Sequence, residues 1–267
     1  MKLLSAAGLV ALLTVAAAAQ EAPPDAPVPS QCLAIAQTVP NVVYANFTQV
    51  QAEEETVTIT YAGHSTYLIE TPGGVRIATD FSGAYGADPL PDVITMNKAH
   101  STHFTLNPDP RIGHVLPGWG EDGPARHAVV VEDVYIRNVP TDIMRWGASE
   151  EGANSIFIFE VAGLCIGHLG HLHHALAPEH YGAIGRLDVV MVPIDGGMTL
   201  SLGDVSEITT RLQSSIVLPM HRFSTPISTF AAMIGENFEV EYRDSRSFDV
   251  SLRTLPRRPT VLILEGV

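Results

Sequence analysis

Residues 165–174, which read CIGHLGHLHH, constrain this chain more than any other stretch. They bring His168, His171, His173 and His174 to the end of an apolar run at 156–166. The run is rich in β-branched and aromatic residues and predicts two strands joined at Gly163. Several imidazoles gathered where a strand ends indicate a binding site at the edge of a sheet.

Two other predicted strands also end in histidine. His100 and His103 follow a strand at 92–96, and His221 follows a strand at 215–218. Residues three apart, such as His100 and His103, share one face of a helical turn. Neutral imidazole suits zinc, iron, nickel and copper, and a tight site needs three or four such groups. We therefore expect His100, His103, His171 and His221 to converge on a metal, whereas the adjacent His173 and His174 point opposite ways and at most one faces it.

The N-terminus resembles a cleavable export signal. Lys2 precedes an apolar core at 3–15 and four alanines at 16–19, which indicates cleavage after Ala19 or Gln20. A membrane anchor is the alternative, but the apolar stretch is shorter than the roughly 20 residues that a span needs. We predict a signal peptide at 1–20, a linker with a short helix at 21–45, one domain at 46–267, and a periplasmic or secreted protein.

Composition narrows the function classes. The formal charge of −14 and the absence of a basic patch argue against nucleic-acid binding. The hydrophobic content of 46%, without a later apolar run of membrane length, predicts a soluble globular domain with no integral membrane segment after signal cleavage. Cys32 and Cys165 could form a disulfide in an oxidising compartment or remain separate thiols. The sequence leaves the oligomeric state open.

The order of predicted elements favours two mixed sheets packed face to face with helices outside. A strand at 187–193, a helix at 203–212 and the strand at 215–218 predict a parallel crossover. We expect long loops at 104–123 and 140–153. The remaining strands are predicted at 57–61, 66–70, 75–79, 128–131, 134–139, 238–242, 247–252 and 260–264, and the remaining helices at 178–184 and 226–234.

Five segments carry a family resemblance: YAGHSTYLIE at 61–70, ATDF at 78–81, residues 92–103, IGHLGH at 166–171 and LPMH at 218–221. Their order resembles that of metallo-β-lactamase fold hydrolases. The branch it is most similar to includes ascorbate-phosphate lactonase-like proteins and the phospholipase D that acts on N-acyl phosphatidylethanolamines. The resemblance spans nearly the whole mature chain and implies an αββα sandwich with a metal site at one edge, between the sheets.

The chain departs from that family's Thr-His-x-His-x-Asp-His signature, because residues 97–103 read NKAHSTH. His100 and His103 match two of its histidines, Lys98 replaces another, and Thr102 replaces the aspartate that orients the nucleophilic water. His171 corresponds to the metal-bridging aspartate, and the final histidine is retained as His221. Asp142 lies in about the region of the family's other mid-chain histidine.

These departures favour one metal over two, because neutral imidazole cannot offset the repulsion between two cations as a shared carboxylate does. The resemblance implies ligands from His100, His103, His171 and His221, with His168 as a ligand or part of the wall. Asp80 would accept a hydrogen bond from a ligand imidazole. His64 would line the pocket or donate to an oxyanion.

The resulting expectation is an exported hydrolase that uses a divalent metal, with zinc first and iron or manganese as alternatives, to activate water against a small-molecule ester, lactone or phosphoester. Lys98 would serve as an acid or a charge clamp, or else be a solvated surface lysine. The alternative is a metal-binding or ligand-binding protein that kept the fold without turnover. Replacement of one metal ligand by another, as at His171, favours a re-tuned metal site over a degraded one.

Overall fold

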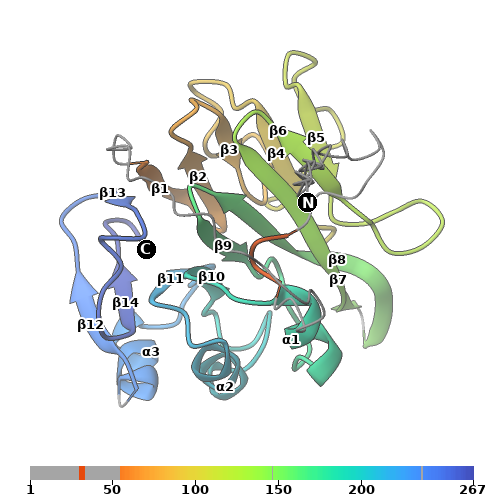
Figure 1. The fold of residues 1–267 in the computed structure, drawn as a ribbon. Helices are drawn as coiled ribbons and strands as arrows, with labels where there is room; N and C mark the ends of the chain where they lie inside the picture. The colour runs from red at the N-terminus through yellow and green to blue at the C-terminus, as the bar shows by residue number, and fades with distance from the viewer. Residues whose placement is uncertain (1–29, 34–54, 146, 236) are drawn as a thin grey trace, which may run out of the picture.

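The computed structural model describes residues 30–33, 55–145, 147–235 and 237–267. They form two mixed β-sheets packed face to face (Figure 1). The first sheet has six strands, in the order β13 (Ser247–Val250), β1 (Val57–Gly63), β2 (Thr66–Glu70), β3 (Arg76–Ala78), β4 (Val93–Met96) and β5 (His114–Pro117). The two-sheet sandwich predicted from the order of elements is confirmed.

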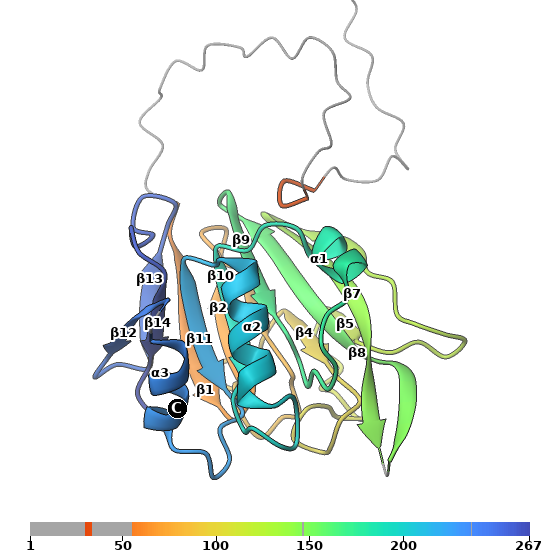
Figure 2. The same ribbon diagram turned by 90° about the horizontal axis from the view of Figure 1, so that it is seen from below.

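The second sheet has eight strands and carries the helices. Its order is β12 (Glu239–Tyr242), β14 (Thr260–Ile263), β11 (Ile216–Met220), β10 (Val189–Pro193), β9 (Leu164–His168), β8 (Ala148–Val161), β7 (Val134–Arg145) and β6 (Ala128–Val131). Helices α1 (Pro178–Ile184), α2 (Leu202–Leu212) and α3 (Ile227–Ile234) lie over its outer face (Figure 2). Strands β10 and β11 are parallel, as the predicted crossover requires.

The pattern of buried and exposed residues along each strand reflects what covers the two faces of its sheet. In β1, Val57, Ile59 and Tyr61 are buried and join the core between the sheets, whereas the residues between them are partly exposed. Strands β9, β10 and β11 are buried at every position, because the other sheet covers one face and the helices cover the other. In the described residues the outer face of the six-stranded sheet packs against loops, through Phe81 and Ile112, rather than against helices.

Two predicted loops contain strands. The 104–123 loop includes β5, a four-residue edge strand that pairs in parallel with β4. The 140–153 loop is instead the outer part of the β7–β8 hairpin, which continues past Pro140 with a shift in register between Thr141 and Ile143. The sequence did not predict this extension, because Pro140 and the polar residues that follow it are typical of a loop. The end of a hairpin can form with few buried apolar residues.

The strand ends place the histidine-bearing loops together. Strands β3 and β4 are parallel in the first sheet, and β9, β10 and β11 are parallel in the second. Their carboxyl ends meet at one edge of the sandwich. There the Tyr67 hydroxyl donates to the backbone oxygen of Pro219, 2.9 Å away in the opposite sheet. The sheets are therefore joined by a buried hydrogen bond beneath the loops that carry histidine.

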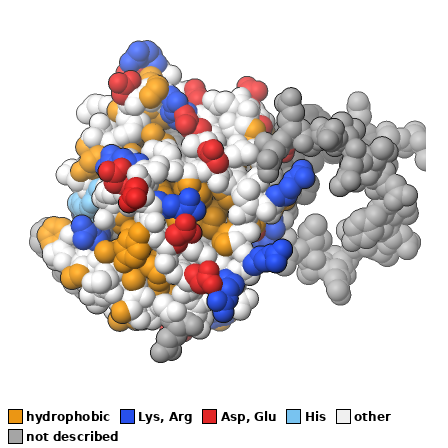
Figure 3. Space-filling model, turned by 90° about the vertical axis from the view of Figure 1, so that its left-hand side faces the viewer, with side chains coloured by type: hydrophobic (Ala, Val, Ile, Leu, Met, Phe, Trp, Pro, Cys, Tyr) orange, Lys and Arg blue, Asp and Glu red, His pale blue; other side chains and the backbone are white. Residues whose placement is uncertain are grey.

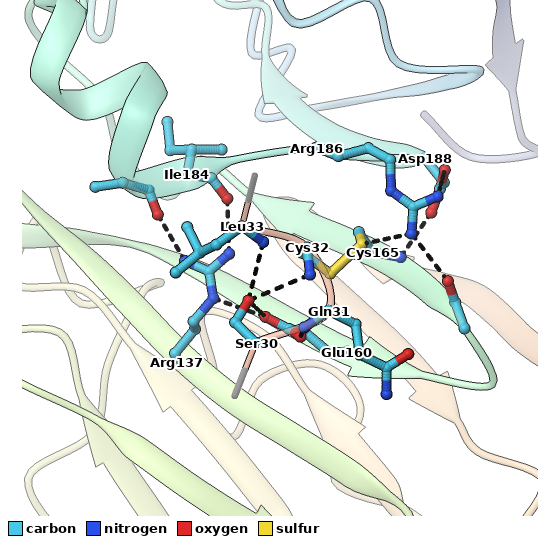
Figure 4. The surroundings of a disulfide bond; sticks show 12 residues. Ser30, Gln31, Cys32, Leu33, Arg137, Glu160, Cys165, Ile184, Arg186 and Asp188 are labelled. Atoms are coloured by element: carbon cyan, nitrogen blue, oxygen red, sulfur yellow. Dashed lines mark hydrogen bonds and ion pairs between the residues drawn. A yellow bond between two sulfur atoms is a disulfide. The ribbon is translucent and has the colours of Figure 1, made fainter. Parts of the chain in front are cut away.

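A disulfide joins Cys32 to Cys165 at the other end of β9 (Figure 4). The Glu160 carboxylate accepts hydrogen bonds from the Ser30 hydroxyl (2.5 Å) and the Gln31 backbone N–H (2.7 Å). The buried Arg137 guanidinium donates to the same carboxylate at 2.7 Å. Of the two possibilities left open by the sequence, the structure contains the disulfide.

The predicted signal peptide and most of the predicted linker lie outside the described residues, as do positions 34–38 of the predicted short helix. Among the described residues, no helix is both long and apolar enough to cross a membrane.

Candidate metal centre

Three imidazoles point their Nε2 atoms at one another. The Nε2 of His100 lies 3.2 Å from that of His103 and 3.3 Å from that of His221. Nitrogens bound to one zinc ion at about 2.0–2.1 Å in a tetrahedral arrangement are about 3.3–3.4 Å apart. The distances from His100 Nε2 to the other two atoms therefore fit neighbouring positions around a single cation.

The opposite ring nitrogen of each of these histidines has its own partner. Nδ1 of His103 lies 2.8 Å from Asp80 Oδ2, and Nδ1 of His221 lies 2.8 Å from Asp195 Oδ2. Nδ1 of His100 lies 2.8 Å from the Thr102 hydroxyl. An acceptor at Nδ1 keeps the proton there and leaves the Nε2 lone pair free for a metal. The two carboxylates thus hold the rings of His103 and His221 in the form that a metal ligand needs, and the Thr102 hydroxyl restrains the orientation of the His100 ring.

The ring of His171, on a loop of the eight-stranded sheet, lies beside these three rings, although its donor atom is not within the 4.8 Å that spans those of His64, His100, His103 and His221. Its ring centre lies 4.7 Å from that of His103 and 4.8 Å from that of His221. Its Nδ1 lies 2.7 Å from Nε2 of His173, while its Nε2 is buried and has no hydrogen-bond partner. A buried polar atom without a partner is costly and calls for an explanation such as an ion. A metal would satisfy this nitrogen.

His64 approaches the same centre from the β1–β2 turn. It adopts a positive φ of 53°, which is unusual for a residue other than glycine, and its Nε2 is buried without a partner. Its ligand atom and those of His100, His103 and His221 lie within 4.8 Å of one another. The backbone oxygen of His64 accepts a hydrogen bond from the His221 N–H (2.9 Å), which connects the two sheets inside the cluster.

Burial and mutual repulsion lower the pKa values of His64, His100, His171 and His173, so that these four imidazoles are neutral at neutral pH. Burial, followed by the charges of neighbouring histidines, lowers the pKa of His64 to about 3 and that of His100 to about 4. The same causes lower the pKa of His171 further, and burial lowers that of His173 to about 4. Because only neutral imidazole binds a metal, His64, His100 and His171 can bind one at neutral pH without first losing a proton.

The two carboxylates behind the rings remain ionised. Burial raises the pKa of Asp80, but the charges of His168 and His103 and the hydrogen bonds from His103 and Asn97 outweigh it, and the net pKa is lowered. Burial also opposes ionisation of Asp195, but hydrogen bonds from His221 and Thr199 lower its pKa well below its usual range. In the described residues no carboxylate oxygen belongs to the group of converging donor atoms.

His168 and Lys98 lie apart from the convergence point. His168 is fully buried, and its Nε2 donates to the Ser65 backbone oxygen at 2.8 Å while its Nδ1 accepts from the Gly170 N–H at 3.1 Å. Both of its nitrogens are thus used by the backbone, which makes His168 part of the wall. The Lys98 ammonium faces outward and pairs with Glu150 at 2.5 Å.

Sequence reasoning missed Asp195 and the contact between His173 and His171. Asp195 follows β10 as Asp80 follows β3, and each carboxylate binds the histidine that follows the adjacent parallel strand. An aspartate directly after an apolar strand was therefore a signal that the sequence contained twice. Asp142 is not part of the cluster: it accepts a hydrogen bond from the Gly152 N–H at 2.8 Å.

The centre is open to solvent on one side. His64 and His100 are partly exposed, whereas His103 and His221 are buried. At the left margin of Figure 3 a histidine side chain reaches the surface beside basic and hydrophobic side chains. A small molecule could thus approach the imidazoles from solvent.

Known proteins resemble this chain in sequence. A family model described as a beta-lactamase superfamily domain matches residues 58–221. A UPF0173 metal-dependent hydrolase of Pyrococcus furiosus is 24% identical over 219 residues, which cover 69% of this chain and 95% of the relative. A second UPF0173 metal-dependent hydrolase, from Thermococcus kodakarensis, is 26% identical over 215 residues, with 69% and 95% covered.

Solved structures agree on the fold. A candidate zinc-dependent hydrolase of the metallo-beta-lactamase superfamily from Thermotoga maritima superposes with a TM-score of 0.54 at 26% identity, covering 78% of this chain and 98% of the other. A metallo hydrolase from Ignicoccus hospitalis gives a TM-score of 0.52 at 20% identity, covering 68% and 91%. The family model spans more than half of the chain. The chain therefore belongs to the β-lactamase superfamily domain family and has a metallo-β-lactamase fold.

Proposed function

We propose that this protein is an exported hydrolase that uses one divalent metal, zinc first, to cleave an ester, lactone or phosphoester bond in a small molecule. The observation that carries the proposal is the convergence of imidazole Nε2 atoms whose Nδ1 atoms are all engaged elsewhere. Relatives named metal-dependent hydrolases support the reaction class. The order of the motifs supports the lactonase-like branch of the superfamily.

The donor set favours a single cation. Its members are neutral imidazoles, and the nearest carboxylates, Asp80 and Asp195, contact the outer nitrogens of His103 and His221. Two cations close together need negative charge between them, and the imidazole of His171 supplies none. We assign His100, His103, His171 and His221 as ligands, with His64 at a further position.

A metal bound here would polarise the substrate oxygen and lower the pKa of a bound water. The protein residues would do the rest. The carboxylates of Asp80 and Asp195 hold the rings of His103 and His221 in one tautomer and one orientation, and the Thr102 hydroxyl restrains the orientation of the His100 ring. His64 reaches the cluster on a strained turn, which fixes it on the open side.

Export rests on the predicted signal peptide together with the Cys32–Cys165 disulfide, because disulfides persist in oxidising compartments. We place the mature protein in the periplasm or outside the cell.

One observation favours the alternative of a metal-binding protein without turnover. Thr102 occupies the position of the carboxylate that orients water in the family, and its hydroxyl contacts His100 instead. No carboxylate in the described residues takes over that task at the centre.

Metal analysis and a substrate panel separate the two functions. The mature protein should contain about one metal ion per chain, and the His171→Ala variant should lose it while His114→Ala, outside the cluster, retains it. Wild-type protein should hydrolyse at least one ester, lactone or phosphodiester in a manner that a chelator abolishes and added zinc restores. Stoichiometric metal without chelator-sensitive turnover on the whole panel would establish the binding protein, and absence of metal would refute both.

A further inference from the structure

The loop that follows His221 carries an arginine without a partner. Of the lysines and arginines in the described part of the chain, Arg222 alone is half-buried and makes neither an ion pair nor a hydrogen bond through its side chain. The other half-buried or buried cations, Arg76, Arg137 and Arg145, all pair with glutamates. An arginine presents a fixed fork of donors suited to carboxylate and phosphate.

The loop holds Arg222 next to the imidazole cluster. His221 precedes it in the chain, and the Thr225 hydroxyl donates to the Asp195 backbone oxygen at 2.5 Å, which closes the loop against the residue that orients His221. Burial raises the pKa of Tyr61 on balance, while the positive charge of Arg246 and, more weakly, that of Arg222 lower it. The Tyr61 hydroxyl donates to the His64 backbone oxygen at 3.1 Å. Arg222 thus directly follows a histidine of the cluster, on a loop fixed against Asp195, and its charge reaches Tyr61, whose hydroxyl contacts His64.

The backbone on either side of Arg222 is strained. His221 has a φ of 51° and Phe223 a φ of 49°, and left-handed backbone is costly for bulky residues. Phe223 is also 73% exposed, so packing of its own ring does not explain the conformation. Strain of this kind persists where the surroundings enforce it, and here it presents one cation and one aromatic ring to solvent beside the centre.

We propose that Arg222 is a specificity-determining residue that binds a compact anionic group, phosphate or carboxylate, of the molecule that occupies the metal centre, with Phe223 against an adjoining apolar group. This role of Arg222 rests on the proposed hydrolase function and specifies its substrates as molecules that carry a phosphate or carboxylate group. Lys98 and Arg145 do not compete for this role, because both pair with Glu150. In a chain of charge −14, a local unpaired cation supplies the attraction that the overall charge does not.

A binding measurement tests the proposal without requiring turnover. Zinc-loaded wild type, Arg222→Gln, Arg222→Lys and Arg253→Gln are titrated calorimetrically with phenylphosphonate, benzoate and neutral benzamide, after metal content has been checked in each. Arg253 is an exposed arginine beyond Val250, which pairs with Val57 at the end of β1 farthest from His64, so its variant matches the charge change at the opposite end of the sheet.

Arg222→Gln should bind at least one of the two anions about tenfold more weakly than wild type, whereas Arg253→Gln should match wild type. Arg222→Lys should retain an intermediate affinity, and benzamide binding should not respond to either change. The anion that loses more affinity identifies the preferred group. Equal anion affinities in wild type and Arg222→Gln, or no anion binding by wild type, would overturn the proposal. If anion binding depends on Arg222 while no substrate is turned over, the inference stands and the hydrolase function fails.

Discussion

Asp195 offers the sharpest test of how the protein prepares its imidazoles. Its Oδ1 accepts backbone N–H groups from Gly197 (2.9 Å), Met198 (2.5 Å) and Thr199 (2.9 Å), and its Oδ2 faces Nδ1 of His221 (2.8 Å). In an Asp195→Asn variant the three N–H groups retain the oxygen, so the amide nitrogen must turn toward His221. An N–H facing Nδ1 forces the proton onto Nε2 and removes the lone pair that would bind the metal.

The expected loss can be given a magnitude. Replacing residues that orient metal ligands typically costs about 10–100-fold in metal affinity, which corresponds to about 1.4–2.7 kcal/mol at 1.36 kcal/mol per factor of ten. Competition against a chromophoric zinc chelator measures this affinity. Asp249→Asn is the matched control, because Asp249 accepts a hydrogen bond from Thr58 on the exposed face of the first sheet.

The result has a clear refutation. Circular dichroism and the melting temperature of the metal-free protein show whether the variant is folded. If folded Asp195→Asn binds zinc as tightly as wild type and Asp249→Asn do, His221 is not a ligand in the tautomer inferred here. Asp80→Asn repeats the test from the other sheet, since the Asn97 amide retains one oxygen and leaves the new nitrogen facing His103.

Three further outcomes are expected. Replacing Cys32 and Cys165 together with serine opens a link across 133 residues and should lower the free energy of unfolding by about 2–5 kcal/mol; an unchanged guanidinium midpoint would show that the Glu160 contacts suffice. Because the folded protein lowers the pKa of His100 to about 4 from 6.5, the unfolded chain binds more protons between these values, so the melting temperature of metal-free protein should fall as pH drops through this range, less steeply in His100→Asn, and equal slopes would contradict the shift. Lys98→Gln should change zinc affinity by less than about twofold in the competition assay, because exposed ion pairs such as Lys98–Glu150 contribute little; a tenfold loss would place Lys98 at the centre.

Much of the fold followed from periodicity. Strands with strict alternation, such as Val57–Gly63, and buried runs, such as Val189–Pro193, were predictable because burial on one or two faces leaves a direct imprint on composition. The His114–Pro117 edge strand and the outer half of the β7–β8 hairpin were missed, because edge pairing depends on backbone hydrogen bonds that many side chains tolerate.

The candidate site divides in the same way. The histidines that end predicted strands were identifiable, because strand ends at one edge converge whatever the loop details. Whether a particular ring faces the centre depends on loop backbone, and the sequence left His168, which is held by Ser65 and Gly170, as either a ligand or part of the wall. Asp195 was overlooked because its partner His221 is 26 residues away in the chain and adjacent only through the pairing of β10 with β11.

The imidazoles come from both sheets: His64, His100 and His103 from loops of one, His171 and His221 from loops of the other. The distance between the two sheets therefore sets the distances between the donor nitrogens of the two groups. Side chains deep in the sandwich, such as Tyr67 beneath Pro219, act as spacers for that gap. A substitution there that enlarges or reduces the interior would change the spacing of the donors, and with it the preferred ion, without replacing any donor residue. The choice of metal in this fold can therefore change through substitutions in its core.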